Sequence, residues 1–511
     1  MVLMVVAAWA GGVSGDLPPP EAPYKILMLL PVSSRSHNRV FQPVAEALAD
    51  RGHQVVMLTN IPVASKHPNI KEINHGLSFF EVAKVNMFEV RKNENFGGLK
   101  KTMLSFAKHL YKVPAVAKLF ERRKEFDVIL VNHWFNEFAY PFVHEVPFIT
   151  VATPGLDPHQ SAVLGNVLSP SYVPDMMFLP TSFPMSAWNR FKNVLCLLAS
   201  GVTWRHWDVV PLVQGEISAH FPDLPPLLEI ERNQSLTLMN THFSITTPVP
   251  LLPSQVEVGA MHCRPAKPLP KDLESWLAGA GSAGVIYFSL GSVTRGETMP
   301  PEYRQAFLEA FRRLPQRVLW KYEGELEGVS DNVRISSWLP QQDVLAHDSV
   351  KVFISHGGLL SLQESIFHAT PLLVLPIFGD QPKNAMFVEN SGLGHRLVWE
   401  ELTADSIVDA LTDIITKPKY KENVTRMSAS LRDQLTTPQE RAVFWTEYVI
   451  RHRGAPQLRC PGAQLSWVQF LMLDVVGLLL AALLLLVFIL RRFVRTVSAI
   501  LFGNTAKKKT A

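Results

Sequence analysis

Short apolar runs alternate with segments of helical periodicity along most of the chain, a pattern typical of parallel α/β sheets. Lys25–Leu30 is an apolar run, a polar loop follows it, and the next segment is apolar at helical spacing until Gly52. A further apolar run at residues 53–59 completes a strand, loop, helix, strand order, which predicts a βαβ unit. The buried-strand pattern recurs at residues 126–131 and 148–152.

A second unit of the same kind begins near residue 284. Residues 301–314 have helical spacing, and helices are expected from about residue 403 to 452. The runs that predict its strands are residues 285–290, 317–322, 351–355 and 372–375.

Three glycines before this second unit match the dinucleotide-binding fingerprint, namely Gly279, Gly281 and Gly284. That motif requires a strand before the glycines and a helix after them, whereas here the strand follows them. We interpret them as a turn, which removes the main support for an NAD enzyme.

A proline-rich junction separates the two units. We therefore predict an α/β protein with two doubly wound domains, residues 24–250 and 284–455, joined by a linker at residues 251–283. Residues 155–250 are rich in proline and irregular, with aromatic and aliphatic residues scattered through them. We expect this stretch to wall a hydrophobic cavity.

The two ends of the chain carry targeting patterns. Residues 1–15 resemble a secretory signal peptide, because an apolar run leads into small residues; a buried first strand is the alternative. Residues 467–490 are a run of 24 whose only charge is Asp474. As a helix this run would span about 36 Å, enough to cross a membrane. The basic tail at residues 491–511 favours a cytosolic C-terminus and a lumenal or extracellular body.

Two smaller motifs agree with such a location. Lys508 and Lys509 resemble the di-lysine retrieval signal of type I membrane proteins resident in the endoplasmic reticulum, although an ordinary basic tail would look the same. Asn233 and Asn423 begin N-glycosylation motifs that a lumenal body could use.

Charge and cysteine content narrow the classes of function. The chain has 511 residues and a net charge of +4, but six positive residues lie after the last apolar run, and without them the net charge is −2. No large cationic surface remains to neutralise phosphates, so nucleic acid is excluded as the main partner. The three cysteines, Cys196, Cys263 and Cys460, allow at most one intramolecular disulfide.

The strongest chemical signal lies between residues 335 and 381. The run KVFIS predicts a strand that places His356, Gly357 and Gly358 at the start of a helix, where free N–H groups and the helix dipole favour a diphosphate. Glu364 follows about two helical turns later and could accept hydrogen bonds from both ribose hydroxyls. Taken alone, His356 could be a turn residue and Glu364 a solvated helix residue, so the joint spacing carries the inference.

Two further groups flank this segment. Trp338, held by a following proline, offers a flat face on which a base could stack, although a core tryptophan is the alternative. Asp380 and Gln381 follow a predicted strand, at the edge of the sheet where α/β proteins bind ligands.

The run W-x-P-Q, H-G-G, Q-E and D-Q resembles the signature of the UDP-glycosyltransferases, membrane-bound enzymes that conjugate small lipophilic molecules with the sugar of a UDP-sugar. The similarity covers nearly the whole chain, about residues 24 to 490. The resemblance implies a GT-B fold, in which two Rossmann-like domains face a cleft, plus one C-terminal transmembrane helix. The N-terminal domain would bind the acceptor and the C-terminal domain the UDP-sugar, which is a co-substrate, so that no cofactor and no metal are expected.

By this resemblance, the donor site would be divided among residues of the C-terminal domain. The implied contacts are Trp338 on uracil, Gln341 on the nucleoside, Ser292, His356 and Gly358 on the diphosphate, Glu364 on the ribose, and Asp380 with Gln381 on the sugar hydroxyls. Leu360 stands where vertebrate drug-conjugating members have Asn, a form similar to the invertebrate branch, and it removes one polar contact to the phosphates.

The resemblance also assigns the catalytic base to His37, in the loop after the first strand, where it could take the proton of an acceptor hydroxyl. Many members orient this His with an Asp, but the matching position here is Asn132, which carries no charge. Asp127 would lie at the far end of the strand, whereas Glu137 is near enough in sequence to substitute. The missing charge predicts slower turnover unless another carboxylate serves.

The function expected from this resemblance is inverting transfer of a hexose from UDP-sugar to a hydroxyl or similar nucleophile on a small lipophilic acceptor. Glucose is favoured and glucuronate is left open. The alternatives are a weak or catalytically silent member that binds UDP-sugar or a lipophile, and a membrane-anchored transport protein for hydrophobic ligands. A homo-oligomer is also left open.

Overall fold

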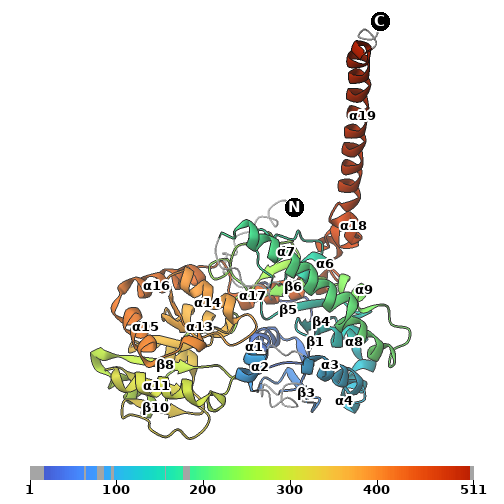
Figure 1. Ribbon diagram of the computed structural model, residues 1–511. Coiled ribbons are helices and arrows are strands. Elements are labelled where there is room, and N and C mark those ends of the chain that lie inside the picture. Colours follow the sequence, from blue (N-terminus) through green and yellow to red (C-terminus); the bar gives the residue numbers. More distant parts are fainter. Residues whose placement is uncertain are drawn as a thin grey trace, which may run out of the picture.

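The chain is described from a computed structural model, which covers residues 17–506 except 62–64, 78–85, 94–96, 156 and 176–183. The signal peptide predicted at residues 1–15 and the di-lysine motif lie outside the described residues. Two parallel sheets, side by side in Figure 1, form the cores of the molecule. The predicted α/β class with two sheets is therefore confirmed.

The first sheet has seven strands in the order β3-β2-β1-β4-β5-β6-β7. Its strands are β1 (Lys25–Leu30), β2 (Gln54–Thr59), β3 (Ile70–Asn74), β4 (Val128–Asn132), β5 (Phe148–Ala152), β6 (Leu236–Met239) and β7 (Gln255–Glu257). The helices before β7 are α1 (Arg35–Asp50), α2 (Met87–Asn93), α3 (Gly97–Leu110), α4 (Pro114–Glu121), α5 (Tyr140–Val143), α6 (Pro158–Val163), α7 (Ala187–Val202), α8 (Val209–Ser218) and α9 (Leu227–Arg232). Phe88 of α2 packs in the core of the second sheet.

The second sheet has six strands in the order β10-β9-β8-β11-β12-β13. Its strands are β8 (Val285–Ser289), β9 (Arg317–Lys321), β10 (Val333–Ser336), β11 (Val350–Ser355), β12 (Leu372–Val374) and β13 (Gly394–Arg396). The helices after β7 are α10 (Lys271–Ala278), α11 (Pro301–Arg313), α12 (Gln341–Leu345), α13 (Leu359–Phe367), α14 (Gln381–Asn390), α15 (Ala404–Thr416), α16 (Pro418–Arg432) and α17 (Pro438–Arg451).

The order in which successive strands are added to each sheet reverses at its centre, between β1 and β4 in the first sheet and between β8 and β11 in the second. Their central strands are buried on both faces, as their near-continuous apolar runs require. In such sheets ligands bind beyond the carboxyl ends of the strands that flank the reversal. The loops after β1, β4, β8 and β11 are therefore the places where a site is expected.

The helix after β1 begins earlier than its apolar pattern indicates. The polar segment read as a loop is the first turn of α1, because the side chain of Ser34 accepts a hydrogen bond from the His37 backbone N–H and caps the helix. Pro43 lies inside α1. The segment at Gly279–Gly284 is a short 3₁₀ turn before β8, as its order relative to the strand predicts.

The helices of residues 403–452 do not all stay with the second sheet. Ala442, Val443 and Val449 of α17 pack in the core of the first sheet with residues of α1. Buried Glu447 pairs there with Arg51 and with His53. The boundaries 24–250, 251–283 and 284–455 remain a prediction, and α17 contacts the first of these segments.

The C-terminal apolar segment is a long helix that stands away from the body (Figure 1). The run expected at residues 467–490 is divided into a short helix, α18 (Trp467–Phe470), and a long one, α19 (Leu473–Ala506). Met472, between them, has a positive φ of 53°. Leu473–Leu501 is long and apolar enough to cross a membrane.

Candidate active site at the cleft between the two sheets

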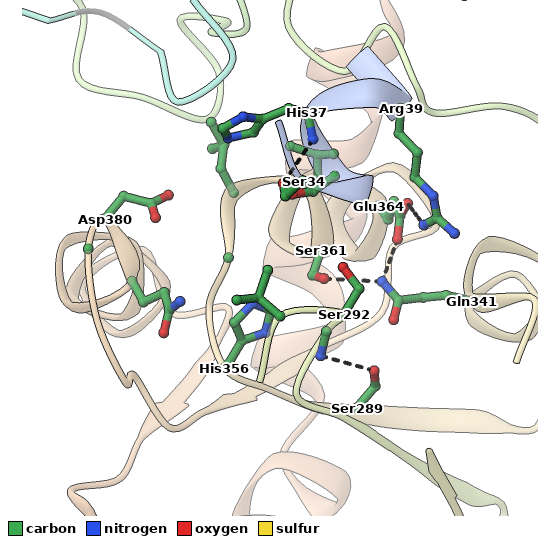
Figure 2. A pocket seen from close by; sticks show the side chains of 18 of the residues that line it. Ser34, His37, Arg39, Ser289, Ser292, Gln341, His356, Ser361, Glu364 and Asp380 are labelled. Carbon is green, nitrogen blue, oxygen red and sulfur yellow. Dashed lines mark hydrogen bonds and ion pairs between the residues drawn. The ribbon is translucent and has the colours of Figure 1, made fainter. Parts of the chain in front are cut away.

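One cavity lies between the carboxyl ends of the two sheets, and residues of both sheets line it (Figure 2). His37 and Arg39 of α1 reach it from the first sheet, and Trp134 and Thr153 lie on the same side. Most of the residues expected to hold the donor line the opposite side: Ser292, Trp338, Gln341, His356, Gly358, Glu364, Asp380 and Gln381. The structure thus brings together residues that are up to about 340 positions apart in sequence.

His356 occupies the turn between β11 and α13, and the glycines around it are required by geometry. Gly357 has a φ of 83°, which favours glycine, and its added Cβ would lie 2.7 Å from Val374. A Cβ on Gly358 would lie 2.6 Å from the imidazole of His356. Gly358 caps α13, so this turn holds the ring beside the free N–H groups of the helix N-terminus.

The His356 ring is neutral at physiological pH, because burial and the nearby charge of Lys321 lower its pKa to about 4. Its Nδ1 is buried and has no hydrogen-bond partner among the described residues. A neutral imidazole can donate one hydrogen bond to an anion.

Lys321 is a cation in this cavity that the sequence pattern did not reveal. It is the last residue of β9, it is buried, and its Nζ donates to the carbonyl oxygen of Gly291 at 2.9 Å and pairs with Glu323. Gly291 and Ser292 form the turn after β8 that also lines the cavity. A lysine at a strand end has no distinctive spacing, and only the order of the strands shows that it faces the site.

Glu364 is fully buried on α13 and is not a solvated helix residue. Its Oε2 accepts a hydrogen bond from Gln341, and Gln341 also donates to Ser361 at 3.1 Å. Its Oε1 has no hydrogen-bond partner among the described residues, and burial raises the pKa of this carboxyl despite the bond from Gln341. This buried Oε1 lies 4.0 Å from Arg39 Nη1 and 3.6 Å from Nε2 of the buried His262, so Glu364 keeps one acceptor oxygen without a hydrogen bond.

Trp338 is half exposed at the mouth of the cavity, which excludes the alternative of a core tryptophan. The guanidinium groups of Arg39 and Arg35, from α1 across the cleft, lie 5.4 and 5.8 Å from its ring centroid. Arg39 also lies 4.0 Å from Glu364. These two arginines were not predicted from the sequence, because only the folded chain brings them near Trp338.

Asp380 and Gln381 lie at the start of α14, on the far side of the cavity from Glu364 (Figure 2). Burial raises the pKa of Asp380, and the hydrogen bond from Asn384 at 2.8 Å opposes this effect. The side-chain oxygen Oε1 of Gln381 accepts from the backbone N–H groups of Ile377 and Phe378. Asp380 is thus an acceptor for hydroxyls, whereas Gln381 has only its amide N–H groups to offer.

His37 lies in the first turn of α1, where it lines the cavity beside Trp134. Burial, followed by the nearby His133, lowers its pKa to about 4, so the ring is neutral at physiological pH. A neutral imidazole can accept a proton, but at this pKa it does so weakly.

The polar group nearest to His37 is Asn132, at the end of β4. Its Nδ2 lies 3.5 Å from His37 Nδ1 and donates to the Val32 carbonyl oxygen at 3.1 Å, while its Oδ1 accepts from Thr153 at 3.4 Å. The carbonyl of Val32 accepts only, so it fixes which end of the amide faces His37. The amide nitrogen therefore faces Nδ1, and this arrangement favours a ring that carries its proton on Nε2.

The carboxylates near this histidine have other partners. Glu137 accepts a hydrogen bond from the indole of Trp204 at 3.2 Å, and Asp127 accepts one from the Lys25 backbone N–H at the other end of the sheet. Asp157 pairs with His133, which keeps the pKa of Asp157 well below its usual range although burial opposes this. The effect of His133 on His37 is to lower its pKa, which is opposite to the effect of a neighbouring carboxylate.

Taken together, the cavity offers an aromatic face at Trp338 with a carboxylate at Glu364, a turn at His356 that suits an anion, and hydroxyl acceptors at Asp380. His37 faces this set from the other sheet. No group of three or more His, Cys, Asp or Glu side chains that could hold a metal ion occurs in the part of the chain that the structure describes. The three cysteines are free.

Comparisons with known proteins agree with this arrangement. The family model described as "UDP-glucoronosyl and UDP-glucosyl transferase" matches residues 25–509. The chain is 34% identical over 505 residues to UDP-glycosyltransferase UGT5 of Dactylopius coccus, covering 95% of both chains. It is 33% identical to UDP-glucosyltransferase 2 of the same organism, covering 89% of this chain and 90% of the other. It is 31% identical to UDP-glucuronosyltransferase 2B9 of Macaca fascicularis, again covering 89% and 90%.

Two solved structures show the same fold. The glycotransferase of kitacinnamycin superposes with a TM-score of 0.60 at 19% identity, covering 84% of this chain and all of that one. The enzyme LpCGTa in complex with UDP superposes with a TM-score of 0.54 at 19% identity and the same coverage. Both likenesses support the GT-B arrangement of two facing Rossmann-like domains. The chain therefore belongs to the UDP-glucoronosyl and UDP-glucosyl transferase family and is a glycosyltransferase whose donor substrate is a UDP-sugar.

Proposed function

We propose that the protein transfers glucose from UDP-glucose, with inversion, to a hydroxyl of a small lipophilic acceptor, and that His37 is the general base. The observation that carries this proposal is the position of His37, which enters from one sheet the same cavity that His356, Glu364 and Asp380 line from the other. An acceptor beside Trp134 would have its hydroxyl near His37 and would face a sugar held near Asp380.

In this scheme the diphosphate lies at the N-terminus of α13, with His356, Gly358 and Ser292 around it. The helix dipole and the free N–H groups stabilise the negative charge that develops on UDP as it leaves. Glu364 and Gln341 hold the nucleoside together with Trp338, and Asp380 with Gln381 holds the sugar hydroxyls. Glucose is favoured because relatives from Dactylopius coccus include a UDP-glucosyltransferase, whereas a UDP-glucuronosyltransferase among the relatives keeps glucuronate as the second candidate.

A second candidate function is supported by the amide of Asn132. Its Nδ2 faces His37 Nδ1, which favours the proton on Nε2, and the charge that would stabilise the imidazolium is absent. The alternative is therefore a weak or silent member that binds UDP-sugar or a lipophile with little transfer.

The cellular location is proposed from α19 and the basic residues that follow its apolar part. We expect α19 to anchor the protein as a single-pass type I protein of the endoplasmic reticulum membrane, with the body in the lumen and the basic tail in the cytosol. This location would suit a role in the detoxification of lipophilic compounds. It would also allow glycosylation at Asn233 and Asn423.

The test uses microsomes that carry the full chain, with UDP-glucose, UDP-glucuronate or UDP-galactose and a panel of phenols and sterols. The proposal predicts UDP release with UDP-glucose, a β-linked product, and loss of both in His37→Ala. UDP release no higher than in His37→Ala, from a preparation that still binds UDP, would instead establish the silent member. A preference for UDP-glucuronate would overturn the choice of sugar.

A further inference from the structure

Helix α7 has its polar and apolar faces reversed relative to a helix that covers a sheet. Its buried face includes Asn189 and Asn193, and Asn193 donates to the carbonyl oxygens of Pro170 and Val173 and accepts from the Asp175 backbone N–H. Its outer face carries large apolar side chains at helical spacing, namely Trp188, Phe191, Val194, Leu195 and Leu198. We call these five residues the α7 stripe.

The α7 stripe is strongly exposed for apolar side chains. Trp188 is 61% exposed and stacks on Phe191 with ring centroids 5.4 Å apart. Trp207, which follows α7, is 79% exposed. Contiguous exposed apolar surface of this kind marks a contact with a membrane or another protein.

Cations lie on both sides of the stripe. Lys192 is exposed, and its Nζ lies 5.3 Å from the ring centroid of Trp188. Arg190 is also exposed, and at 100° per residue it lies at the opposite edge of the stripe. An apolar face with tryptophan and flanking basic residues is the composition of a helix that lies in the interface of a bilayer with anionic lipids.

Hydrogen bonds connect α7, through α6, to the segment just before the membrane helix. His159 of α6 contacts Ser200 of α7 at 3.0 Å, and it also fills the space beside Gly201. At the other end of α6, the carbonyl oxygen of Gly165 accepts from the Cys460 thiol at 3.4 Å, a few residues before α18. Figure 1 shows α7 and α18 at the same end of the body, the end from which α19 leaves.

We infer that α7 lies on the surface of the same bilayer that α19 crosses, with the α7 stripe in the lipid interface. The inference rests on α19 spanning the membrane, and it does not depend on the sugar or the acceptor. The bilayer is the occupant that the observations favour, because the stripe lies at the end of the body from which α19 leaves and its flanking charges suit anionic headgroups. The body would then rest against the membrane and not swing freely from its anchor.

The test uses the full chain reconstituted in vesicles of phosphatidylcholine and phosphatidylserine. Cys196 and Cys460 are replaced by serine, and buried Cys263 is kept because it is shielded from labelling. An environment-sensitive fluorophore is attached to Leu195→Cys, and in a matched control to Glu309→Cys on α11, which lies far from α19 in Figure 1. Resistance to alkaline extraction shows in each sample that α19 is inserted.

The inference predicts that lipids with a nitroxide near the headgroup quench the probe at position 195 and leave the probe at position 309 unquenched. Introducing Phe191→Glu should abolish the quenching at position 195 without releasing the protein from the vesicles. Leu198→Cys serves as a second labelling site, and circular dichroism establishes that each variant is folded. Equal lipid quenching at positions 195 and 309, in a chain that resists extraction, overturns the inference. Self-quenching at position 195 that disappears when unlabelled chain is added also overturns it, in favour of a second copy.

Discussion

Restoring a charge beside His37 is the sharpest test of the catalytic scheme. In the variant Asn132→Asp a carboxylate replaces the amide nitrogen that lies 3.5 Å from His37 Nδ1. With the two charges about 4 Å apart, a carboxylate and an imidazolium attract each other by about 4 kcal/mol at an effective dielectric constant of about 20. That attraction moves the pKa of His37 from about 4 to roughly 7.

The same change corrects the position of the proton on the ring. The carboxylate accepts from Nδ1–H, which leaves Nε2 free to take the proton of the acceptor hydroxyl. If about half of this attraction is present in the transition state, the activation free energy falls by roughly 2 kcal/mol. A decrease of this size raises kcat about thirtyfold. The variant also loses the hydrogen bond to the Val32 carbonyl oxygen, so its free energy of unfolding should fall by about 1–3 kcal/mol.

The assay is UDP release with UDP-glucose and a phenol between pH 4 and 9. The acidic limb of the kcat profile reports protonation of His37, so it should lie near pH 4 in the native chain and move upward in Asn132→Asp. Asn132→Ala is the matched control, because it removes the same hydrogen bond to Val32 without adding a charge. The gain should vanish in the double variant with His37→Ala. A folded Asn132→Asp protein with unchanged kcat and an unmoved acidic limb would refute the reasoning.

Three further predictions concern the donor side and the buried histidines. Trp338→Ala should raise the KM for UDP-glucose about tenfold through lost stacking, whereas Trp338→Phe keeps most of it, and an unchanged KM in steady-state kinetics contradicts the stacking role. Glu364→Gln should weaken UDP binding roughly tenfold to a hundredfold in calorimetry, because a charged acceptor is lost, and equal affinity would count against a ribose contact. Burial lowers the pKa values of His356 and His262 to about 4 from 6.5. Because both rings are neutral in the folded chain, their contribution to the free energy of unfolding is fully present above about pH 6.5. As the pH falls toward 4, the unfolded chain takes up protons first, and the free energy of unfolding decreases by up to about 3 kcal/mol for each histidine. Thermal unfolding across this range measures the loss, and a flat profile would show that both rings titrate normally.

The α/β class and the strands at the centre of each sheet could be predicted because local pattern determines them, whereas most of the residues that line the cavity were expected from the resemblance to a family signature. A continuous apolar run such as Phe148–Ala152 is buried on both faces, and its bounds match β5. The short edge strands β3 and β13 were not predicted, since Ile70–Asn74 and Gly394–Arg396 carry little apolar pattern.

The irregular appearance of residues 155–250 has a specific physical cause in α7. Its buried face includes asparagines that bond to backbone groups, and its exposed face is apolar, so the usual rule of apolar inside and polar outside fails there. Arg39 was missed for a different reason. Its partners Trp338 and Glu364 are about 300 positions away in sequence, and only the facing of the two sheets brings them together.

The packing of α17 against the first sheet has a consequence for how the cleft can open. The chain passes from the first half of the molecule to the second between β7 and α10, and it returns between α16 and α17. Two domains joined by one chain segment can rotate relative to each other in any direction. Two connecting segments restrict the domains to rotation about the line that joins these segments. We therefore expect opening to admit a sugar nucleotide to be a hinge motion about that line, which would return His37 to the same position over the donor in every cycle.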